Sequence, residues 1–489
     1  MNHKILVCFF LLIVIVTAAG SGCISESDNM PEEEIENIED IEGLWMGSLE
    51  VQGGQELRIL FNISTGPEGS PTATMDSLDQ GVSGIPVEKL TYKDGNLRLE
   101  VTSTGVFEGV LKEDGTALEG EWKQSGLVLP LVLTRIEEKP EMSREQDPVK
   151  PYPYDEEEVV YENKEAGIQL AGTLTTPKTE GPFPAVLLIT GSGKQDRNEE
   201  VFGHRPFLVL SDYLTRQGIA VLRVDDRGVG GSTGNFSNVT TEDFAEDVVA
   251  GVEYLKSRED IDPDRIGLVG HSEGGLVAPM AAVRSPDVAF IVLMAGPGVT
   301  GEEIVLAQSR LVAEADGVPE ETITKNEALL KDIFTVIKEE ENDTIAGEEI
   351  HGLITDMVEN LSEEEKQYSS YTEESLDTEI KLLVSPWTRY FLTYDPKTTL
   401  MEVECPVLAI NGEKDLQVPP EENLAAIEEA LEAGGNEDYT VKELPGLNHL
   451  FQTAETGSPS EYAAIEETMS PAAMELIGDW ILERTRMEE

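Results

Sequence analysis

Cysteine is scarce in this sequence, which has three cysteines among 489 residues. Cys8 and Cys23 lie near the N-terminus, so only Cys405 remains in the body of the chain. An intramolecular disulfide framework is therefore excluded there. Cys405 precedes Pro406 at the start of an apolar run, a position typical of a small core residue rather than of a nucleophile.

Positive charge is also scarce. The chain has 35 Lys and Arg against 96 Asp and Glu, a formal net charge of −61 at pH 7. A surface of this sign repels phosphate backbones, so no nucleic-acid partner is expected. The acidic residues are spread along the whole chain. Because self-repulsion on this scale needs screening, we interpret the surface as an adaptation to high salt; a merely soluble acidic surface is the alternative.

Apolar runs longer than about ten residues are lacking, apart from residues 5–16, which follow Lys4. This run is too short for a comfortable transmembrane helix and predicts a signal peptide over residues 1–22. The small residues before Cys23 resemble a lipobox, in which the cysteine becomes the lipidated new N-terminus. We expect export and a lipid anchor on Cys23 at the outer face of the cell membrane. An ordinary signal peptide with an incidental cysteine, or an uncleaved anchor, are the alternatives.

The N-terminal part of the mature chain is expected to hold a small β domain. Residues 23–42 are acidic and poor in large apolar side chains, which indicates a solvated tether. Residues 43–136 show strand-like alternation with hairpin signals such as Asp94-Gly95, and predict an antiparallel barrel or sandwich. Residues 43–47 resemble the opening of lipocalin-like barrels. Prolines among charges mark residues 137–158 as a linker.

Residues 159–489 change to an α/β pattern, in which short apolar strands alternate with helical stretches. This alternation predicts a mostly parallel sheet of eight strands covered by helices on both faces. Between about residues 299 and 399 the alternation stops, and the polar, helical pattern there predicts a cap over the carboxyl edge of the sheet. The first two strands are expected within residues 159–176, and the other six at residues 185–190, 219–224, 266–270, 290–295, 407–411 and 439–444.

Two segments match the pattern G-x-S-x-G, which places a nucleophilic serine on a sharp turn from strand to helix. Ser272 follows the apolar residues 266–270 and precedes a second apolar stretch, residues 276–283, so it has the required frame. Ser232 follows the polar Asp225-Asp226-Arg227-Gly228 and precedes a loop-like stretch. Context therefore selects Ser272 as the nucleophile.

A serine hydroxyl needs a base, and the chain has five histidines. His449 follows the last predicted strand, where a loop can return to the serine, so it is the expected base. The acid that orients it should follow the seventh strand, where Glu413 and Asp415 are both in reach. We favour Asp415 because Leu416-Gln417-Val418-Pro419 then closes the loop.

The oxyanion formed in the reaction needs two N–H donors. The residue after the nucleophile supplies one, which here is Glu273. The glycine-rich loop after the third strand supplies the other, and Ser192 in Gly191-Ser192-Gly193 occupies that place. A mere tight turn or a phosphate-cradling loop is the alternative for these glycines. No His, Cys and Asp grouping has metal-ligand spacing, so neither a metal nor a cofactor is expected.

Together these motifs resemble the α/β-hydrolase superfamily over roughly residues 159–489. They are most similar to the branch that holds dienelactone-hydrolase-like esterases and serine-aminopeptidase-like enzymes. The resemblance implies an esterase that acts on short acyl or aromatic acyl substrates. The residues that carry it are Asp415, His449 and residues 191–198, 225–232 and 270–275.

We therefore expect an exported serine hydrolase that cleaves small-molecule carboxylic esters through an acyl-enzyme on Ser272. A serine peptidase or amidase on the same three residues stays open. A binding protein on an inactive hydrolase scaffold is the alternative from another class, and the retention of Ser272, Asp415 and His449 in order argues against it. The sequence does not indicate the oligomeric state or the role of the β domain.

Overall fold

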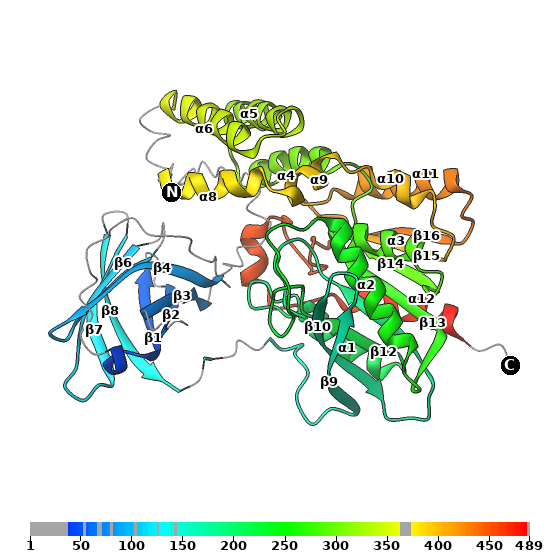
Figure 1. The fold of residues 1–489 in the computed structure, drawn as a ribbon, viewed down its shortest axis with the longest axis horizontal. Helices are drawn as coiled ribbons and strands as arrows, with labels where there is room; N and C mark the ends of the chain where they lie inside the picture. The colour runs from blue at the N-terminus through cyan, green and yellow to red at the C-terminus, as the bar shows by residue number, and fades with distance from the viewer. Residues whose placement is uncertain are drawn as a thin grey trace. The chain divides into compact units, whose positions relative to one another are not determined.

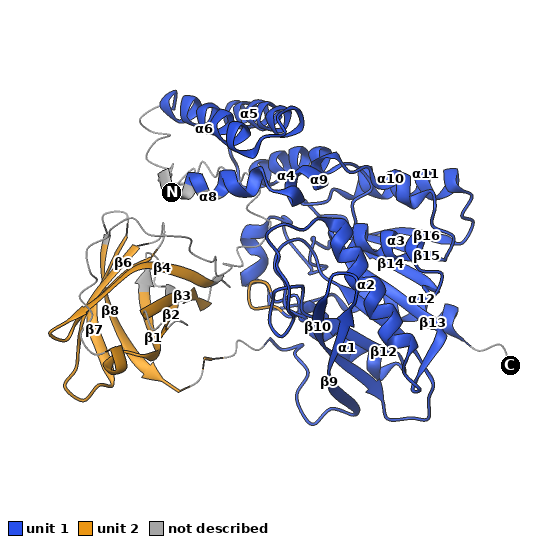
Figure 2. Cartoon of the chain, in the orientation of Figure 1, with its two compact units in different colours: residues 1–16, 144–200, 205–489 blue, residues 17–143, 201–204 orange. Residues whose placement is uncertain are grey.

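The structure is a computed structural model that describes residues 38–51, 55–65, 71–78, 82–101, 105–124, 127–137, 139–140, 144–361 and 373–486. These residues form two compact units (Figure 2). One unit holds the described residues up to 140 together with residues 201–204, and the other holds residues 144–200 and 205–486. The predicted signal peptide, with Cys8 and Cys23, lies outside the described residues.

The smaller unit is a closed antiparallel barrel of eight strands, in which β8 pairs with β1 to complete the ring (Figure 1). The prediction of a small antiparallel β domain is thus confirmed, and closure decides for the barrel over the sandwich. The strands are β1 (Gly43–Val51), β2 (Gln55–Thr65), β3 (Pro71–Ser77), β4 (Val82–Lys93), β5 (Asn96–Val101), β6 (Gly105–Leu111), β7 (Ala117–Gln124) and β8 (Leu127–Ile136).

Large side chains fill the interior of this barrel. Trp45, Phe61, Phe107 and Trp122 are all buried, and the ring of Phe61 lies 6.1 Å from Phe107 and 6.4 Å from Trp122. The indole of Trp45 donates to the Ile41 carbonyl at 2.7 Å. Alternate inward positions along each strand thus supply a packed aromatic core.

The larger unit is built on an eight-stranded sheet with the order β16-β15-β14-β13-β11-β12-β10-β9. Strand β10 pairs antiparallel with both of its neighbours, β9 and β12. The remaining neighbours in the sheet are parallel. All eight strands predicted from the sequence are present, which confirms the fold class. Their bounds are β9 (Tyr154–Asn163), β10 (Ile168–Pro177), β11 (Phe183–Ile189), β12 (Ala220–Val224), β13 (Ile261–His271), β14 (Phe290–Met294), β15 (Val407–Gly412) and β16 (Tyr439–Leu444).

Helices cover both faces of this sheet, which explains why its central strands are continuously apolar. On β11, Leu187 packs into the core beneath α2, α3 and α11, whereas Val186 and Leu188 pack against α1 and α12 on the other face. The helices are α1 (Pro206–Arg216), α2 (Thr241–Lys256), α3 (Gly274–Arg284), α11 (Pro420–Gly434) and α12 (Pro471–Thr485).

The segment between β14 and β15 is helical, as predicted, and has a core of its own. Leu276 of α3 is part of that core, so this cap is seated on the helix that follows the Ser272 turn. In Figure 1 the cap helices lie above the upper ends of β14 and β15. They are α4 (Gly301–Ala315), α5 (Glu320–Glu339), α6 (Asp343–Glu359), α8 (Glu373–Leu383), α9 (Pro386–Thr393) and α10 (Pro396–Leu400).

Within the described part of the chain, no helix has both the length and the apolar character needed to span a bilayer.

Candidate active site

Ser272 occupies the turn between β13 and α3 and has a backbone φ of +52°. A non-glycine residue rarely adopts this left-handed conformation, and the surrounding structure must hold it there. The Ser272 N–H donates to the carbonyl of Met294 on β14 at 2.9 Å, which fixes the turn to the neighbouring strand. The serine is half-buried. This is the strained strand-to-helix turn that the sequence pattern predicts.

The two glycines of this turn provide space. A Cβ on Gly270 would lie 2.0 Å from the Gly274 carbonyl oxygen, and a Cβ on Gly274 would lie 2.3 Å from the Ile189 carbonyl oxygen. Real Cβ atoms essentially never come this close to a backbone oxygen. The turn can therefore close only without side chains at these two positions.

Asp415 and His449 lie in the loops after β15 and β16, and the structure brings them together. Nδ1 of His449 is 2.8 Å from Oδ2 of Asp415, and both side chains are buried. Oδ1 of Asp415 accepts from the N–H groups of Gln417 and Val418, at 2.8 and 2.9 Å. The carboxylate is therefore held by its own loop while the other oxygen orients the imidazole.

Glu413, the other acid in reach by sequence, has a different place. Its Oε2 accepts from the N–H of Gly446 at 2.8 Å, so it joins the two loops rather than contacting His449.

The loop after β11 runs directly beside Ser272. A Cβ on Gly191 would lie 3.2 Å from the Cβ of Ser272, so glycine permits a close approach of this backbone to the nucleophile turn. The Gly191 N–H is already bound to Glu199 at 2.7 Å. Ser192 and Glu273, the two expected oxyanion donors, are neighbours, since the Ser192 side chain acts to lower the pKa of the Glu273 carboxyl.

Glu273 has a second role that the sequence did not indicate, since its side chain connects three parts of the larger unit. Oε1 accepts from the hydroxyl of Thr241 at the start of α2 at 2.7 Å, and from the indole of Trp387 in the cap at 2.8 Å. Burial raises the pKa of Glu273 above its ordinary value, although these donors and Ser192 oppose the shift. Helix α9, which carries Trp387, is started by Ser385, whose hydroxyl accepts from the N–H of Thr388.

A second buried carboxylate stabilises the same loop. Asp226 accepts from the Thr190 hydroxyl and the Gln195 N–H, each at 2.8 Å. Burial raises the pKa of Asp226 well above its ordinary value, because these neutral donors do not replace the lost water and the charges of Glu273 and Glu199 add to the effect.

The hydroxyl of Ser232, in the second G-x-S-x-G segment, makes two hydrogen bonds to the main chain. It donates to the Asp225 carbonyl at 2.7 Å and accepts from the Ala171 N–H at 2.9 Å. This buried serine joins the Asp225 turn to β10, so its hydroxyl is not available to act as a nucleophile.

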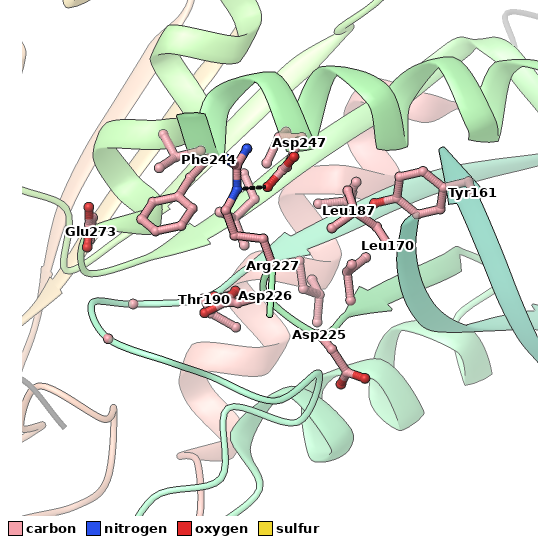
Figure 3. A pocket seen from close by; sticks show the side chains of 17 residues that line it. Tyr161, Leu170, Leu187, Thr190, Asp225, Asp226, Arg227, Phe244, Asp247 and Glu273 are labelled. Carbon is pink, nitrogen blue, oxygen red and sulfur yellow. Dashed lines mark hydrogen bonds and ion pairs between the residues drawn. The ribbon is translucent and has the colours of Figure 1, made fainter. Parts of the chain in front are cut away.

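A cavity of about 50 Å³ lies behind the loop after β11 (Figure 3). Glu273 and Phe244 lie at one end, Tyr161 and Leu170 at the other, and the Arg227–Asp247 ion pair of 2.7 Å between them. This volume has room for a few water molecules. None of Ser272, Asp415 and His449 lines it, so the cavity lies beside the loop and apart from these three side chains.

Among the described residues, no group of three or more His, Cys, Asp or Glu side chains is placed to hold a metal ion. Burial raises the pKa of Cys405 to about 11, so its thiol stays protonated at neutral pH.

Sequence reasoning did not single out Glu199 or His271. In the structure Nδ1 of His271 lies 2.9 Å from Oε1 of Glu199, and its Nε2 lies 3.0 Å from the carbonyl oxygen of His449. The contacts join residues 72 and 178 positions apart, and no local pattern signals them.

Comparison with known proteins agrees with this architecture. Residues 166–442 match the family described as X-Pro dipeptidyl-peptidase (S15 family). Esterase EstD of Thermotoga maritima is 26% identical over 307 residues, covering 62% of this chain and 63% of that one. The match therefore spans less than two thirds of that esterase's own length. Human dipeptidyl peptidase 8 is 33% identical over 142 residues, 27% of this chain and 16% of that one.

Solved structures with similar folds include the Pyrococcus furiosus esterase Pf2001, with 16% identity and a TM-score of 0.41, covering 68% of this chain and 91% of that one. The S15 family match covers more than half of the chain. The protein therefore belongs to the X-Pro dipeptidyl-peptidase (S15) family, within the α/β-hydrolase superfamily.

Proposed function

We propose that the protein is a serine hydrolase that cleaves small carboxylic esters of short or aromatic acids through an acyl-enzyme on Ser272. The observation that carries the proposal is the arrangement around one turn. The strained Ser272 turn lies beside the Gly191 loop, and His271, next to Ser272, contacts the main chain of His449, whose ring is paired with Asp415. The positive φ of Ser272 costs about 1–3 kcal/mol, so this arrangement lowers stability and is better explained by a function of the serine.

The reaction proceeds in two halves. His449 takes the Ser272 proton as Oγ attacks the acyl carbon, and the N–H groups of Ser192 and Glu273 stabilise the oxyanion. The carbon–oxygen bond to the alcohol then breaks, and His449 returns the proton to the leaving alkoxide. Water, deprotonated by His449, attacks the acyl-enzyme, and the acid is released with the proton restored to Ser272. Asp415 keeps the imidazole oriented and stabilises its charged form.

The buried carboxylates beside the turn support an ester more than a peptide with a free N-terminus. Such a peptide needs an acidic group for its ammonium. Glu273 is engaged by Thr241, Trp387 and Ser192, and Asp226 by Thr190 and Gln195, so both already bind donors of their own chain. Esterase EstD, with which this chain shares 26% identity, is named for the same activity.

The test compares kcat/KM for short p-nitrophenyl esters and for aminoacyl-anilides on one preparation. We expect clear ester hydrolysis and weak or absent anilide cleavage. A fluorophosphonate should label the protein, and the labelled peptide should contain Ser272 and not Ser232. A label on Ser232, or no label together with full ester turnover, would contradict the assignment of the nucleophile.

A peptidase is the second candidate, since the family is described by its X-Pro dipeptidyl-peptidase activity and the same three residues can serve amide cleavage. Amide cleavage demands that His449 protonate the departing amine. X-Pro dipeptidyl-anilides should therefore join the substrate panel. Because activated esters are intrinsically easier substrates, anilides cleaved faster than esters would decide for the peptidase.

We also propose that the mature protein is exported and attached to the outer face of the cell membrane through a lipid on Cys23. The residues 5–16 apolar run and the small residues before Cys23 support this. Native protein should partition with membranes, and Cys23→Ser should release it in unlipidated form. An unmodified Cys23 in the mass spectrum of the mature protein would contradict the anchor.

A further inference from the structure

His271 lies between two hydrogen-bond acceptors from different parts of the fold. Its ring is buried, with 7% of the side chain exposed. Nδ1 faces Oε1 of Glu199 at 2.9 Å, and Nε2 faces the main-chain carbonyl of His449 at 3.0 Å. The carbonyl can only accept, so Nε2 carries a proton.

The other nitrogen faces a carboxylate that is already an acceptor. Oε1 of Glu199 also accepts from the N–H of Gly191 at 2.7 Å. A neutral imidazole has one N–H, and that proton is on Nε2, so a hydrogen bond from Nδ1 to an ionised Glu199 requires a second proton. The contacts therefore fit an imidazolium paired with a carboxylate.

The charges around the ring favour the same state. Burial alone would lower the pKa of His271, but the charge and hydrogen bond of Glu199, the His449 carbonyl and the charge of Asp415 outweigh it, and the pKa is raised. The facing titratable groups are Glu199, Asp415 and His449, whose ring centroid lies 4.8 Å away, with Asp226 beyond Glu199. Phe451 closes the ring edge.

We propose that Glu199 and His271 are positioning residues, a buried ion pair that holds the oxyanion loop and the base loop in register around Ser272. The proposal rests on the proposed function. Glu199 binds the N–H of Gly191, next to the expected donor Ser192, while His271 binds the carbonyl of His449 itself. His271 also precedes Ser272 directly, so all three parts of the site meet at this pair.

The pair supplies what the Asp415 contact does not. Asp415 fixes the His449 side chain, whereas His271 fixes the His449 main chain and, through Glu199, its distance from the oxyanion donors. A misplacement of about 1 Å in such a site can cost on the order of 10²-fold in rate. An ion pair between the loop of Glu199 and the end of β13 resists that displacement.

The kinetic test uses Glu199→Gln, His271→Gln and the double variant, with Glu200→Gln as the control for an exposed carboxylate next in sequence. We expect each single variant to lose about 10²-fold in kcat for an ester with little change in KM. The double variant should lose no more than the worse single one, because the two residues act as a unit. Wild-type kcat in both single variants, or additive losses, would overturn the proposal.

Folding of these variants is a separate matter, so a second measurement uses the wild-type chain. With ¹⁵N-labelled histidine, the five ring systems can be resolved by NMR, and His271→Gln identifies one of them. The pH at which His271 loses the second of its two ring N–H signals should lie above the ordinary histidine value of 6.5. Loss of that signal below pH 6.5 would overturn the ion pair. This result does not depend on Ser272, so an active Ser272→Ala would reject the proposed function alone.

Discussion

The chain contains the same five-residue pattern twice, and the two copies solve opposite problems. In residues 270–274 the positive φ falls on the serine, at +52°, and the glycines are there because neighbouring backbone leaves no room for a Cβ. In residues 230–234 the positive φ falls on the glycines, at +51° for Gly230 and +108° for Gly234. The first turn concentrates strain on the serine, and the second keeps strain away from it.

The hydroxyls differ in the same way. The Ser232 hydroxyl donates to the Asp225 carbonyl and accepts from the Ala171 N–H, so both of its hydrogen bonds are structural. The Ser272 turn is held by the main chain instead, through the N–H bond to Met294. The two serines thus differ in what holds them: main-chain bonds fix the backbone of Ser272, and hydrogen bonds fix the hydroxyl oxygen of Ser232.

Replacing the two serines should separate them most sharply. Ser272→Ala should lower kcat/KM by on the order of 10³-fold or more while the protein stays folded, because the nucleophile is lost. Ester turnover and circular dichroism on one preparation measure both properties. Substantial remaining activity in Ser272→Ala would break the comparison at its first step.

The flanking glycines test where the strain lies. In Gly274→Ala the new Cβ would meet the Ile189 carbonyl at 2.3 Å, so the turn must move, at a cost of about 1–3 kcal/mol, and we expect turnover to fall at least about tenfold. In Gly234→Ala the loss of stability should be similar, because alanine is strained at the φ of +108°, but this glycine is not in the Ser272 turn, so turnover should be kept. If Gly274→Ala and Gly234→Ala had the same melting temperature and lost turnover equally, the strain at Gly274 would have no special effect on the Ser272 turn.

Ser232→Ala should affect stability rather than rate. The buried N–H of Ala171 loses its partner, and we expect the free energy of unfolding to fall by about 1–3 kcal/mol. Activity should stay within about twofold of wild type at a temperature where the variant is folded. Urea unfolding curves measure the first effect. An unchanged midpoint would show that the hydroxyl is dispensable to the turn.

The carboxylates beside the two turns should respond oppositely to pH. Burial raises the pKa of Glu273 above 4.5, so its contribution to stability falls as pH rises through the window above that value. For Asp225, burial would raise the pKa, but Arg197 and the loop N–H groups outweigh burial and lower it, so its contribution is present above pH 3.8 and lost in acid.

Melting temperatures of two variants test these signs. As pH rises from 4.5, the melting temperature of Glu273→Gln should rise relative to that of wild type, because only wild type has to ionise the buried carboxyl. Asp225→Asn should be less stable than wild type at neutral pH, and this gap should close as pH falls below 3.8. Parallel curves for both variants would contradict the assigned charge states.

Salt should act on the whole chain and not on either turn. A net charge of −61 predicts that the melting temperature rises between about 0.1 M and molar salt, as the Debye length falls from about 10 Å to about 3 Å. Wild type, Ser272→Ala and Ser232→Ala should shift in parallel. A flat or falling curve would reject adaptation to salt.

The sheet could be predicted from the sequence because it depends on local patterns. The buried parallel strands β11 to β15 each contain a short apolar run, and all eight predicted strands are present. Ser272 was found through its strand and helix neighbours, and His449 and Asp415 through their places after particular strands. These are properties of segments and their succession, which a sequence displays.

The contacts that stabilise the site could not be predicted, because they join side chains that are far apart in the sequence and come together only in the folded chain. His271 meets Glu199 and the His449 carbonyl, and Trp387 meets Glu273, 114 positions away. A buried acid or indole carries no mark of its partner in the sequence. Asp226 was recognised as part of an acidic cluster, yet its bonds to Thr190 and Gln195 required the folded loop.

The helical segment between β14 and β15 leaves the sheet and returns to it at adjacent strands, which pair at Ile291 and Val407. Because the two strands are parallel, the segment starts at the carboxyl end of β14 and ends at the amino end of β15, and the sheet fixes both points whatever lies between them. A segment of this kind is an exchangeable cassette, whose length and inner surface can change without a new fold. Among the contacts that the cassette must keep are an indole or equivalent donor that reaches Glu273 and an apolar surface that packs on Leu276. Chimaeras that keep both contacts offer a direct way to alter which substrates the protein accepts.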